Sequence, residues 1–237
     1  MPRVNHALGW SPAPASQVRK STGVADYLNW VDGNVFLWSI AGARRPMSES
    51  PMPKIVHCIR HGQSTFNAHF AETGEDPLHF DAPLTELGRR QVAERAPDLR
   101  QYAYELVVTS PLTRAIQTTL GLFGNHPAKP PIHIECLHRE HLESSCDVGR
   151  APSLLVQDFP HLAFDHLDEV WWHNEGEPDP RGFVYEPSHI FEGRVMEFRH
   201  WLARRPERLI AVVGHGTFFG RLTGQSLGNC EVAVLEL

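Results

Sequence analysis

From Lys54 to Leu237, short apolar segments alternate with segments of helical periodicity. Helices are expected over Thr85–Gln101, where Thr85 is placed to cap, over Thr113–Phe123, and over residues 188–204. Such alternation predicts an α/β fold with a largely parallel sheet covered by helices. The expected strands are Ile55–Ile59, Glu105–Ser110, Ile132–Leu137, Leu209–Val213 and Val232–Leu237.

Polar clusters follow four of these strands directly. In parallel sheets, ligands bind beyond the carboxyl ends of the strands, so residues placed there meet at one edge. We therefore expect residues far apart in the sequence to form a single site. The clusters are Arg60-His61-Gly62, Ser110 with Arg114, Arg139-Glu140, and Gly214-His215-Gly216.

These residue types suit a phosphate monoester. The ester carries about two negative charges, and arginine pairs with phosphate oxygens through a planar fork, which makes Arg60 and Arg114 the candidate phosphate ligands. Gly62 allows the backbone to approach closely, and a helix beginning near residues 62–64 would direct free N–H groups at the anion.

A histidine among these ligands points to covalent catalysis. The neutral imidazole of His61 can attack phosphorus if its other nitrogen donates to a backbone carbonyl. His215, protonated beside the anion, would stabilise the charge on the transferring oxygens. Glu140 is the candidate general acid, and it would then activate the hydrolytic water; Asp147 and Glu143 are weaker candidates.

Four motifs in this order resemble the histidine phosphatase superfamily, the phosphoglycerate mutase-like group. The first is Ile59-Arg-His-Gly-Gln-Ser-Thr-Phe-Asn67, and the last is Gly214-His-Gly216. Between them lie Leu84-Thr-Glu-Leu-Gly-Arg-Arg-Gln91 and Ser110-Pro-Leu-Thr-Arg-Ala-Ile-Gln-Thr118. The segment around Glu140 further resembles plant and fungal phosphoglycerate mutase-like proteins.

The resemblance implies a three-layer sandwich in which His61 is phosphorylated and Arg60, Arg114 and His215 surround the phosphate. It also implies that Asn67 contributes a donor and that Glu140 is the acid. The chain lacks the Glu-Arg-His-Tyr-Gly-type segment of true mutases at the acid, which favours hydrolysis. Gly216 follows His215 where the acid phosphatase and phytase branch has Asp, which argues against that branch.

Structural interpretations compete at three places. Asn67 would make only a local hydrogen bond if it lies early in a helix. Glu140 would be structural if it formed a salt bridge with Arg139 or Arg150. The run His138–His141 superficially suggests a metal site, but it lacks the helical His-Glu-x-x-His spacing, so we expect no metal and no cofactor.

Composition excludes several classes of partner. The formal charge is −6, from 28 acidic and 22 basic residues, and the chain has no run of Lys and Arg that could contact a phosphate backbone. We therefore expect the protein not to bind nucleic acid. No apolar run reaches the ~18 residues of a membrane span. The four dispersed cysteines are typical of reduced thiols, which favours a cytoplasmic location. A homodimer is compatible with the sequence.

The chain divides by texture into an N-terminal extension, residues 1–53, and a catalytic domain, residues 54–237. The aromatic segment Asp26–Arg45 is expected as a short helix or hairpin packed on the main domain, or else as part of a poorly ordered extension. Residues 141–185 are less regular and are expected to hold the determinants of the substrate.

The sequence thus predicts a phosphomonoesterase that hydrolyses a small phosphorylated metabolite, a sugar or sugar-acid phosphate, through a phosphohistidine on His61. Two alternatives remain: a phosphoglycerate mutase-type isomerase, and a non-catalytic protein that binds phosphorylated ligands.

Overall fold

A computed structural model describes residues 26–31, 34–39 and 53–237 of the chain. By its internal contacts the chain divides into two units, Met1–Met52 and Pro53–Leu237. In the first unit, β1 (Asp26–Val31) and β2 (Asn34–Ser39) form an antiparallel pair. Of the two secondary structures expected for this segment, the strands therefore correspond to the hairpin and not to the helix. How the extension is ordered beyond these strands lies outside the described residues.

The second unit is built on a five-stranded sheet of order β5-β4-β6-β3-β7. Four strands are parallel, and β7 runs antiparallel to β3 at one edge. The five expected strands are therefore present, although β5 ends three residues earlier than predicted. Their bounds are β3 (Ile55–Arg60), β4 (Leu106–Thr109), β5 (Ile132–Ile134), β6 (Leu209–Gly214) and β7 (Val232–Glu236).

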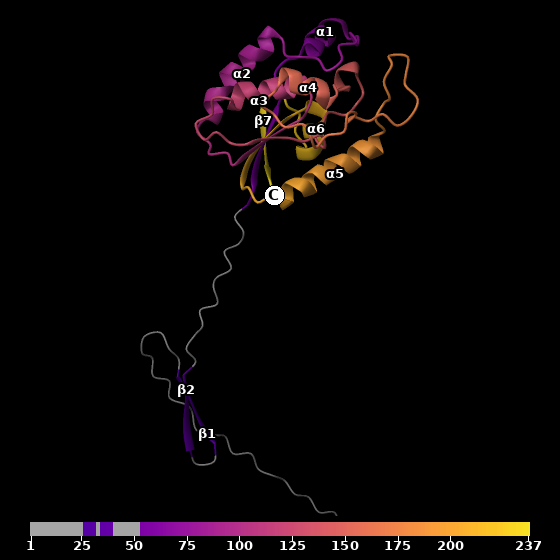
Figure 1. The fold of residues 1–237 in the computed structure, drawn as a ribbon. Helices are drawn as coiled ribbons and strands as arrows, with labels where there is room; N and C mark the ends of the chain where they lie inside the picture. Colours follow the sequence, from indigo (N-terminus) through magenta and orange to yellow (C-terminus); the bar gives the residue numbers. More distant parts are fainter. Residues whose placement is uncertain (1–25, 32–33, 40–52) are drawn as a thin grey trace, which may run out of the picture. The chain divides into compact units, whose positions relative to one another are not determined.

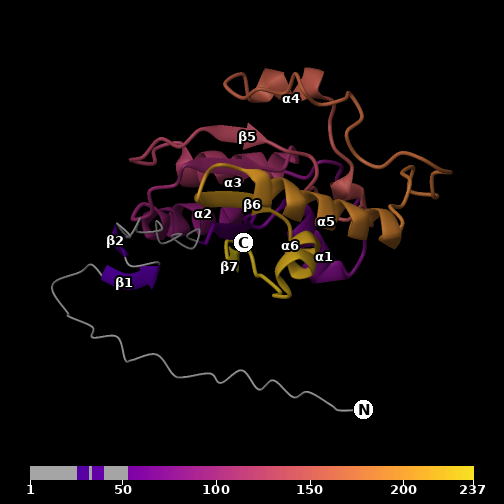
Figure 2. The ribbon, with the colours of Figure 1, turned by 90° about the horizontal axis from the view of Figure 1, so that it is seen from below.

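Helices cover both faces of this sheet, as Figures 1 and 2 show. Successive residues of a strand point to opposite faces, so Val212 packs under α5 and α6 while Val213 packs under α2 and α3. The three-layer α/β sandwich is confirmed. The covering helices are α2 (Glu86–Leu99), α3 (Thr113–Phe123), α5 (Ser188–Arg204) and α6 (Gly216–Thr223).

The helix expected near residues 62–64 is α1 (Thr65–Thr73), which begins after the N-cap Ser64. Three further helical elements were not predicted as such. Within the irregular region lie the 3-10 turn η1 (Ser145–Asp147) and α4 (Pro152–Asp158). The helix α6 was missed because it begins at the last residue of Gly214-His215-Gly216, whose two glycines disfavour a helix in an isolated chain.

Candidate active site

The pairing of strands brings the predicted residues to one edge. Arg60 ends β3 and is paired with Gly214 at the end of β6, so His61 and His215 follow neighbouring strands. Thr109 of β4 is paired with Val213 on the other side of β6. Ser110 and the first turn of α3 therefore lie beside the same strand ends, as predicted from the four polar clusters.

His61 is held in one tautomer. Its ring is buried, and Nδ1 lies 2.7 Å from the Gly62 carbonyl oxygen. Because a carbonyl only accepts, Nδ1 carries the hydrogen and Nε2 keeps its lone pair. Burial first, and then the positive charge of Arg114, lower the pKa of His61 well below its usual value. The imidazole is therefore neutral near pH 7, as a nucleophile requires.

Arg114 lies directly against Nε2 of His61. Its Nε donates to His61 Nε2 at 3.2 Å, Nη1 donates to the Cys146 carbonyl at 2.5 Å, and Nη2 donates to Asp147 Oδ1 at 2.9 Å. The side chains of Arg114 and Asp147 are 3% and 6% exposed, so the pair is buried. Asp147, which the sequence suggested only as a weaker acid, is the ion-pair partner of the proposed phosphate ligand.

His215 lies beside His61, with ring centroids 5.3 Å apart. Its Nε2 is 2.8 Å from Ser110 Oγ, and its Nδ1 is buried with no hydrogen-bond partner among the described residues. Burial, followed by the charge of Arg114, lowers the pKa of His215 well below its usual value. The expected protonated state therefore does not hold without an anion; only a bound anion would supply the charge that offsets burial.

Arg60 depends on the glycine that opens α6. Its Nη1 donates to the Leu227 carbonyl at 2.7 Å, while Nε is buried without a partner among the described residues. A Cβ at Gly216 would lie 3.1 Å from Arg60 Nε and 3.2 Å from Cζ. The guanidinium thus occupies the space that a side chain at residue 216 would take.

The Glu140 carboxylate faces the N-terminus of α6. It accepts from the backbone N–H groups of Thr217 and Phe218, each at 2.9 Å. The salt bridges considered in the structural alternative are absent in the described region, since Arg139 pairs with Glu186 and Arg150 with Asp81 and Asp158. Glu140 is fixed by the positive end of a helix instead.

Arg194 of α5 holds the backbone around Glu140. Its Nη1 donates to the carbonyls of Leu137 and Arg139 at 2.7 and 2.8 Å, and Nη2 donates to the Glu140 carbonyl at 3.1 Å. Glu186, which is fully buried, anchors this guanidinium at 2.6 Å. Arg194 could not be predicted as part of the site, because nothing in the sequence pattern of α5 distinguishes it from a surface arginine.

Asn67 caps helix α1 and also lines the cavity that holds His61. Its backbone N–H and its side-chain oxygen exchange hydrogen bonds with Ser64 at 3.1 Å, forming the capping box of α1. The local hydrogen bond that competed with a ligand role is therefore present. The amide nitrogen of Asn67 takes no part in this box, so its hydrogens remain available to a ligand.

A cavity of about 150 Å³ joins most of these residues. It is lined by Arg60, His61, Asn67, Arg114 and Glu140, while His215 is buried just behind His61. Five of the six predicted residues thus line one cavity, and the ring of the sixth, His215, lies against the ring of His61. The remaining lining residues are Phe66, His141, Glu143, Ser144, Cys146, Asp147 and Thr217.

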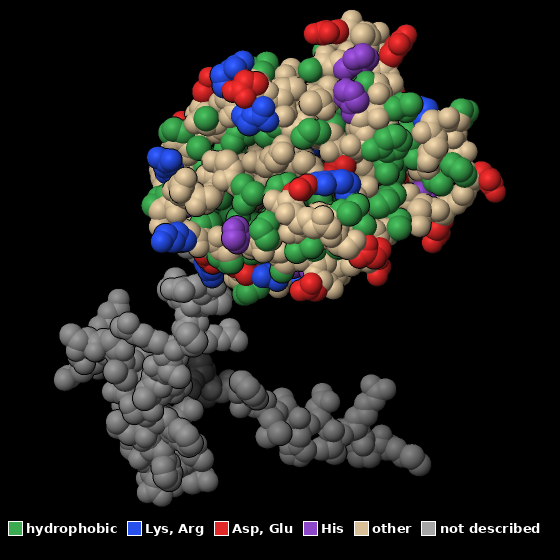
Figure 3. Space-filling model, turned by 45° about the horizontal axis from the view of Figure 1, so that its top comes forward, with side chains coloured by type: hydrophobic (Ala, Val, Ile, Leu, Met, Phe, Trp, Pro, Cys, Tyr) green, Lys and Arg blue, Asp and Glu red, His purple; other side chains and the backbone are tan. Residues whose placement is uncertain are grey.

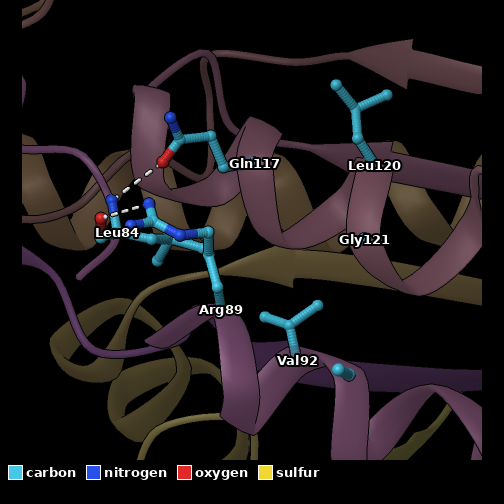
Figure 4. Close-up of a pocket in the computed structure, with 7 residues that line it drawn as sticks. Leu84, Arg89, Val92, Gln117, Leu120 and Gly121 are labelled. Atoms are coloured by element: carbon cyan, nitrogen blue, oxygen red, sulfur yellow. Dashed lines mark hydrogen bonds between the residues drawn. The ribbon is translucent and has the colours of Figure 1, made fainter. Parts of the chain in front are cut away.

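A larger cavity, of about 360 Å³, lies elsewhere, between α2 and α3. Figure 4 shows its apolar wall of Val92 and Leu120, together with the hydrogen bonds that join Leu84 to Gln117 and Arg89. It holds no nucleophile, so size does not identify the reactive site. We assign the chemistry to the smaller cavity, where charge and a nucleophile converge.

The described chain carries no obvious metal or membrane element. No cluster of three or more His, Cys, Asp or Glu side chains among these residues could hold a metal ion. None of the helices in the part of the chain that the structure describes is both long and apolar enough to cross a membrane. On the face in Figure 3, acidic and basic side chains are interspersed, so attraction of an anion depends on the local arginines.

Comparison with known proteins now assigns the family. The model of the histidine phosphatase superfamily (branch 1) matches residues 56–232, which include every site residue described above. The chain belongs to the histidine phosphatase superfamily. The predicted resemblance is confirmed, including its phosphoglycerate mutase-like character.

Individual members of the superfamily carry different names. A phosphoglycerate mutase-like protein of Arabidopsis thaliana is 31% identical over 225 residues, covering 78% of this chain and 79% of its own. The glucosyl-3-phosphoglycerate phosphatase of Mycolicibacterium vanbaalenii is 26% identical and covers 72% of both chains. The crystal structure of the alpha-ribazole phosphatase from Shigella flexneri has a TM-score of 0.52 at 20% identity, covering 76% and 89% of the two chains, and shows the shared fold.

Proposed function

We propose that the protein is a phosphomonoesterase that hydrolyses a small phosphorylated metabolite through a phosphohistidine on His61. The observation that carries this proposal is the state of the imidazole: Nδ1 donates to the Gly62 carbonyl, and the Nε2 lone pair lies in a cavity with two guanidinium groups. Among the relatives, the glucosyl-3-phosphoglycerate phosphatase supports hydrolysis of a phosphate ester.

In the proposed reaction, Arg60 and Arg114 bind the phosphate oxygens and His61 Nε2 attacks phosphorus. The N–P bond forms as the P–O bond to the alcohol breaks, and Glu140 donates the proton that the leaving oxygen needs. Glu140 then takes a proton from water, which attacks the phosphohistidine and releases inorganic phosphate. The positive charges of Arg60 and Arg114 stabilise the transferring group in both steps. His215, which becomes protonated when the phosphate binds, adds a third positive charge.

Replacement of the nucleophile tests this proposal. We expect His61→Ala to lower kcat for p-nitrophenyl phosphate by at least about 1,000-fold, because no other imidazole can replace its lone pair. Rapid quenching of the wild-type protein with labelled substrate should trap an acid-labile phosphoprotein that His61→Ala does not form. The matched control is His200→Ala, an exposed histidine on α5, which should retain wild-type turnover. Full activity of His61→Ala would refute the proposal.

A mutase is the second candidate, favoured by the names of the Arabidopsis relatives. It would transfer the phosphoryl group back to the substrate and would be stimulated by a bisphosphate. Phosphorus NMR of the products distinguishes the two, since a phosphatase yields inorganic phosphate and a mutase yields an isomer. Phosphate binding without turnover across a broad panel of esters would instead indicate a non-catalytic binder.

A further inference from the structure

The lining of the active-site cavity comprises two chemically different groups of residues. Arg60, His61 and Arg114 receive phosphate in the proposed function. The second group, His141, Glu143 and Ser144, belongs to the irregular region after β5. A substrate whose phosphate contacts the first group therefore has the second group in the same small cavity.

Glu143 gives the second group a negative charge with a free acceptor. Its Oε1 accepts from the Tyr185 hydroxyl at 2.5 Å and lies 3.2 Å from His141 Nδ1. Its Oε2 has no hydrogen-bond partner among the described residues, and the side chain is 44% exposed. One carboxylate oxygen of this cavity-lining residue thus remains available to a donor, and Tyr185 and His141 hold the carboxylate in position.

The nearby arginines are already paired with carboxylates. Arg139 and Arg194 share the buried Glu186, and Arg181 pairs with Asp76 and Asp179. None of these three arginines lines the cavity, and its lining contains no lysine. Once phosphate occupies Arg60 and Arg114, a second anionic group on the substrate would meet Glu143 without a free cation to pair with.

We propose that the substrate is a phosphate monoester of a neutral, hydroxyl-bearing alcohol, such as a sugar, and that Glu143 determines this specificity. Its free oxygen accepts a hydrogen bond from a substrate hydroxyl, and its charge repels a carboxylate or a second phosphate. The inference rests on the proposed function and narrows it, because it selects sugar phosphates over sugar-acid phosphates. It also disfavours phosphoglycerate as a substrate.

Two substrates that differ in one group test the proposal. Glycerol 3-phosphate carries a hydroxymethyl group where 3-phosphoglycerate carries a carboxylate. We expect the wild-type protein to prefer glycerol 3-phosphate by at least about tenfold in kcat/KM, from like-charge repulsion at a partly exposed site. The preference should shrink about tenfold in Glu143→Gln and reverse in Glu143→Lys, as measured by release of inorganic phosphate.

The control is Glu177→Gln, which makes the same charge change at an exposed residue of the same irregular region and should keep the wild-type preference. Equal or better turnover of 3-phosphoglycerate by the wild type, or an unchanged preference in Glu143→Gln, would overturn the inference.

A binding measurement separates this inference from the proposed function. Calorimetric titration of His61→Ala with each of the two esters reports the same preference without turnover. If the wild-type protein does not hydrolyse p-nitrophenyl phosphate or either ester, the proposed function fails, yet tighter binding of glycerol 3-phosphate that is lost in the double variant with Glu143→Gln still supports the role of Glu143. Equal affinities for the two esters would contradict it.

Discussion

Arg114 and Asp147 form a buried charge pair next to the proposed nucleophile, His61. The carboxylate is held from two sides. Asp147 Oδ2 accepts from the backbone N–H of Ser144 at 3.2 Å, in addition to the contact of Oδ1 with Arg114. Burial nevertheless raises the pKa of Asp147 to about 6, with Arg114 opposing the rise. Ionising this carboxyl is therefore harder in the folded protein than in the unfolded chain.

This shift makes a prediction about Asp147→Asn. A carboxyl whose pKa rises on folding, here from 3.8 to about 6, stabilises the fold most at low pH and loses that contribution as pH rises through this window. One pKa unit corresponds to about 1.4 kcal/mol, so between pH 4 and pH 7 the free energy of unfolding should shift by about 2 kcal/mol in favour of the variant relative to wild type. Urea denaturation at several pH values measures this difference.

The exposed Asp168 provides the control for this experiment. Asp168→Asn should differ from wild type by a constant amount across the same pH range. A constant difference for Asp147→Asn as well would show that the carboxyl titrates alike in the folded and unfolded chain.

Residues with a chemical motif could be predicted from the sequence, whereas their partners could not. Arg60, His61, Arg114 and His215 each lie in a short motif directly after a strand or in the helix turn that follows. Asp147 lies 33 residues after Arg114, at the end of the short turn η1, and its selection as partner depends on how the largely irregular region around it folds over the site. A single sequence contains no periodic signal for such a pairing.

At the scale of elements, α6 connects the two sides of the site. Its first residue, Gly216, lies under the Arg60 guanidinium, and its free N–H groups hold Glu140. One helix N-terminus thus positions both a proposed phosphate ligand and the proposed acid. The sequence predicted β6 and its polar end but not α6, because contact with the sheet and with Glu140 stabilises this helix more than its own propensity does.

Two glycine substitutions, one in α6 and one in α5, separate an effect on Arg60 from an effect on the stability of the protein. Gly216→Ala would force Arg60 to move by a few tenths of an ångström, so we expect KM for p-nitrophenyl phosphate to rise about tenfold with little loss of stability. Gly193→Ala in α5 meets no atom within 4 Å and should stabilise the protein by up to about 1 kcal/mol at unchanged KM. An unchanged KM in Gly216→Ala would show that Arg60 tolerates the methyl group.

At the scale of the whole molecule, the fold buries several neutral histidines. His61, His138 and His215 are at most 3% exposed, and burial is the first cause that lowers the pKa of each, to about 3 for His138. In the unfolded chain these residues bind protons near pH 6.5. Acid therefore favours unfolding, because the unfolded chain takes up protons that the folded protein excludes.

The expected consequence is a loss of stability in mild acid. A histidine whose pKa falls on folding contributes its full stability above pH 6.5 and loses it as pH decreases. Three such residues should lower the free energy of unfolding by about 4 kcal/mol between pH 7 and pH 5.5, and protonation of Asp147 offsets about 1 kcal/mol of this. Denaturant titrations at these two pH values measure the change. Equal stability at both would mean that the three rings are protonated in the folded protein.

The order of strands in the sheet has a consequence for how the chain acquires its site during synthesis. The strand β6 lies between β4 and β3, yet it is the fourth of these five strands to be made. A nascent chain that ends before Leu209 has no strand to join β4 to β3, so Arg114 has no framework that places it against His61. Fragments lacking the last thirty or so residues would thus carry the reactive groups without assembling them, and an incomplete product in the cell would not act on phosphate esters.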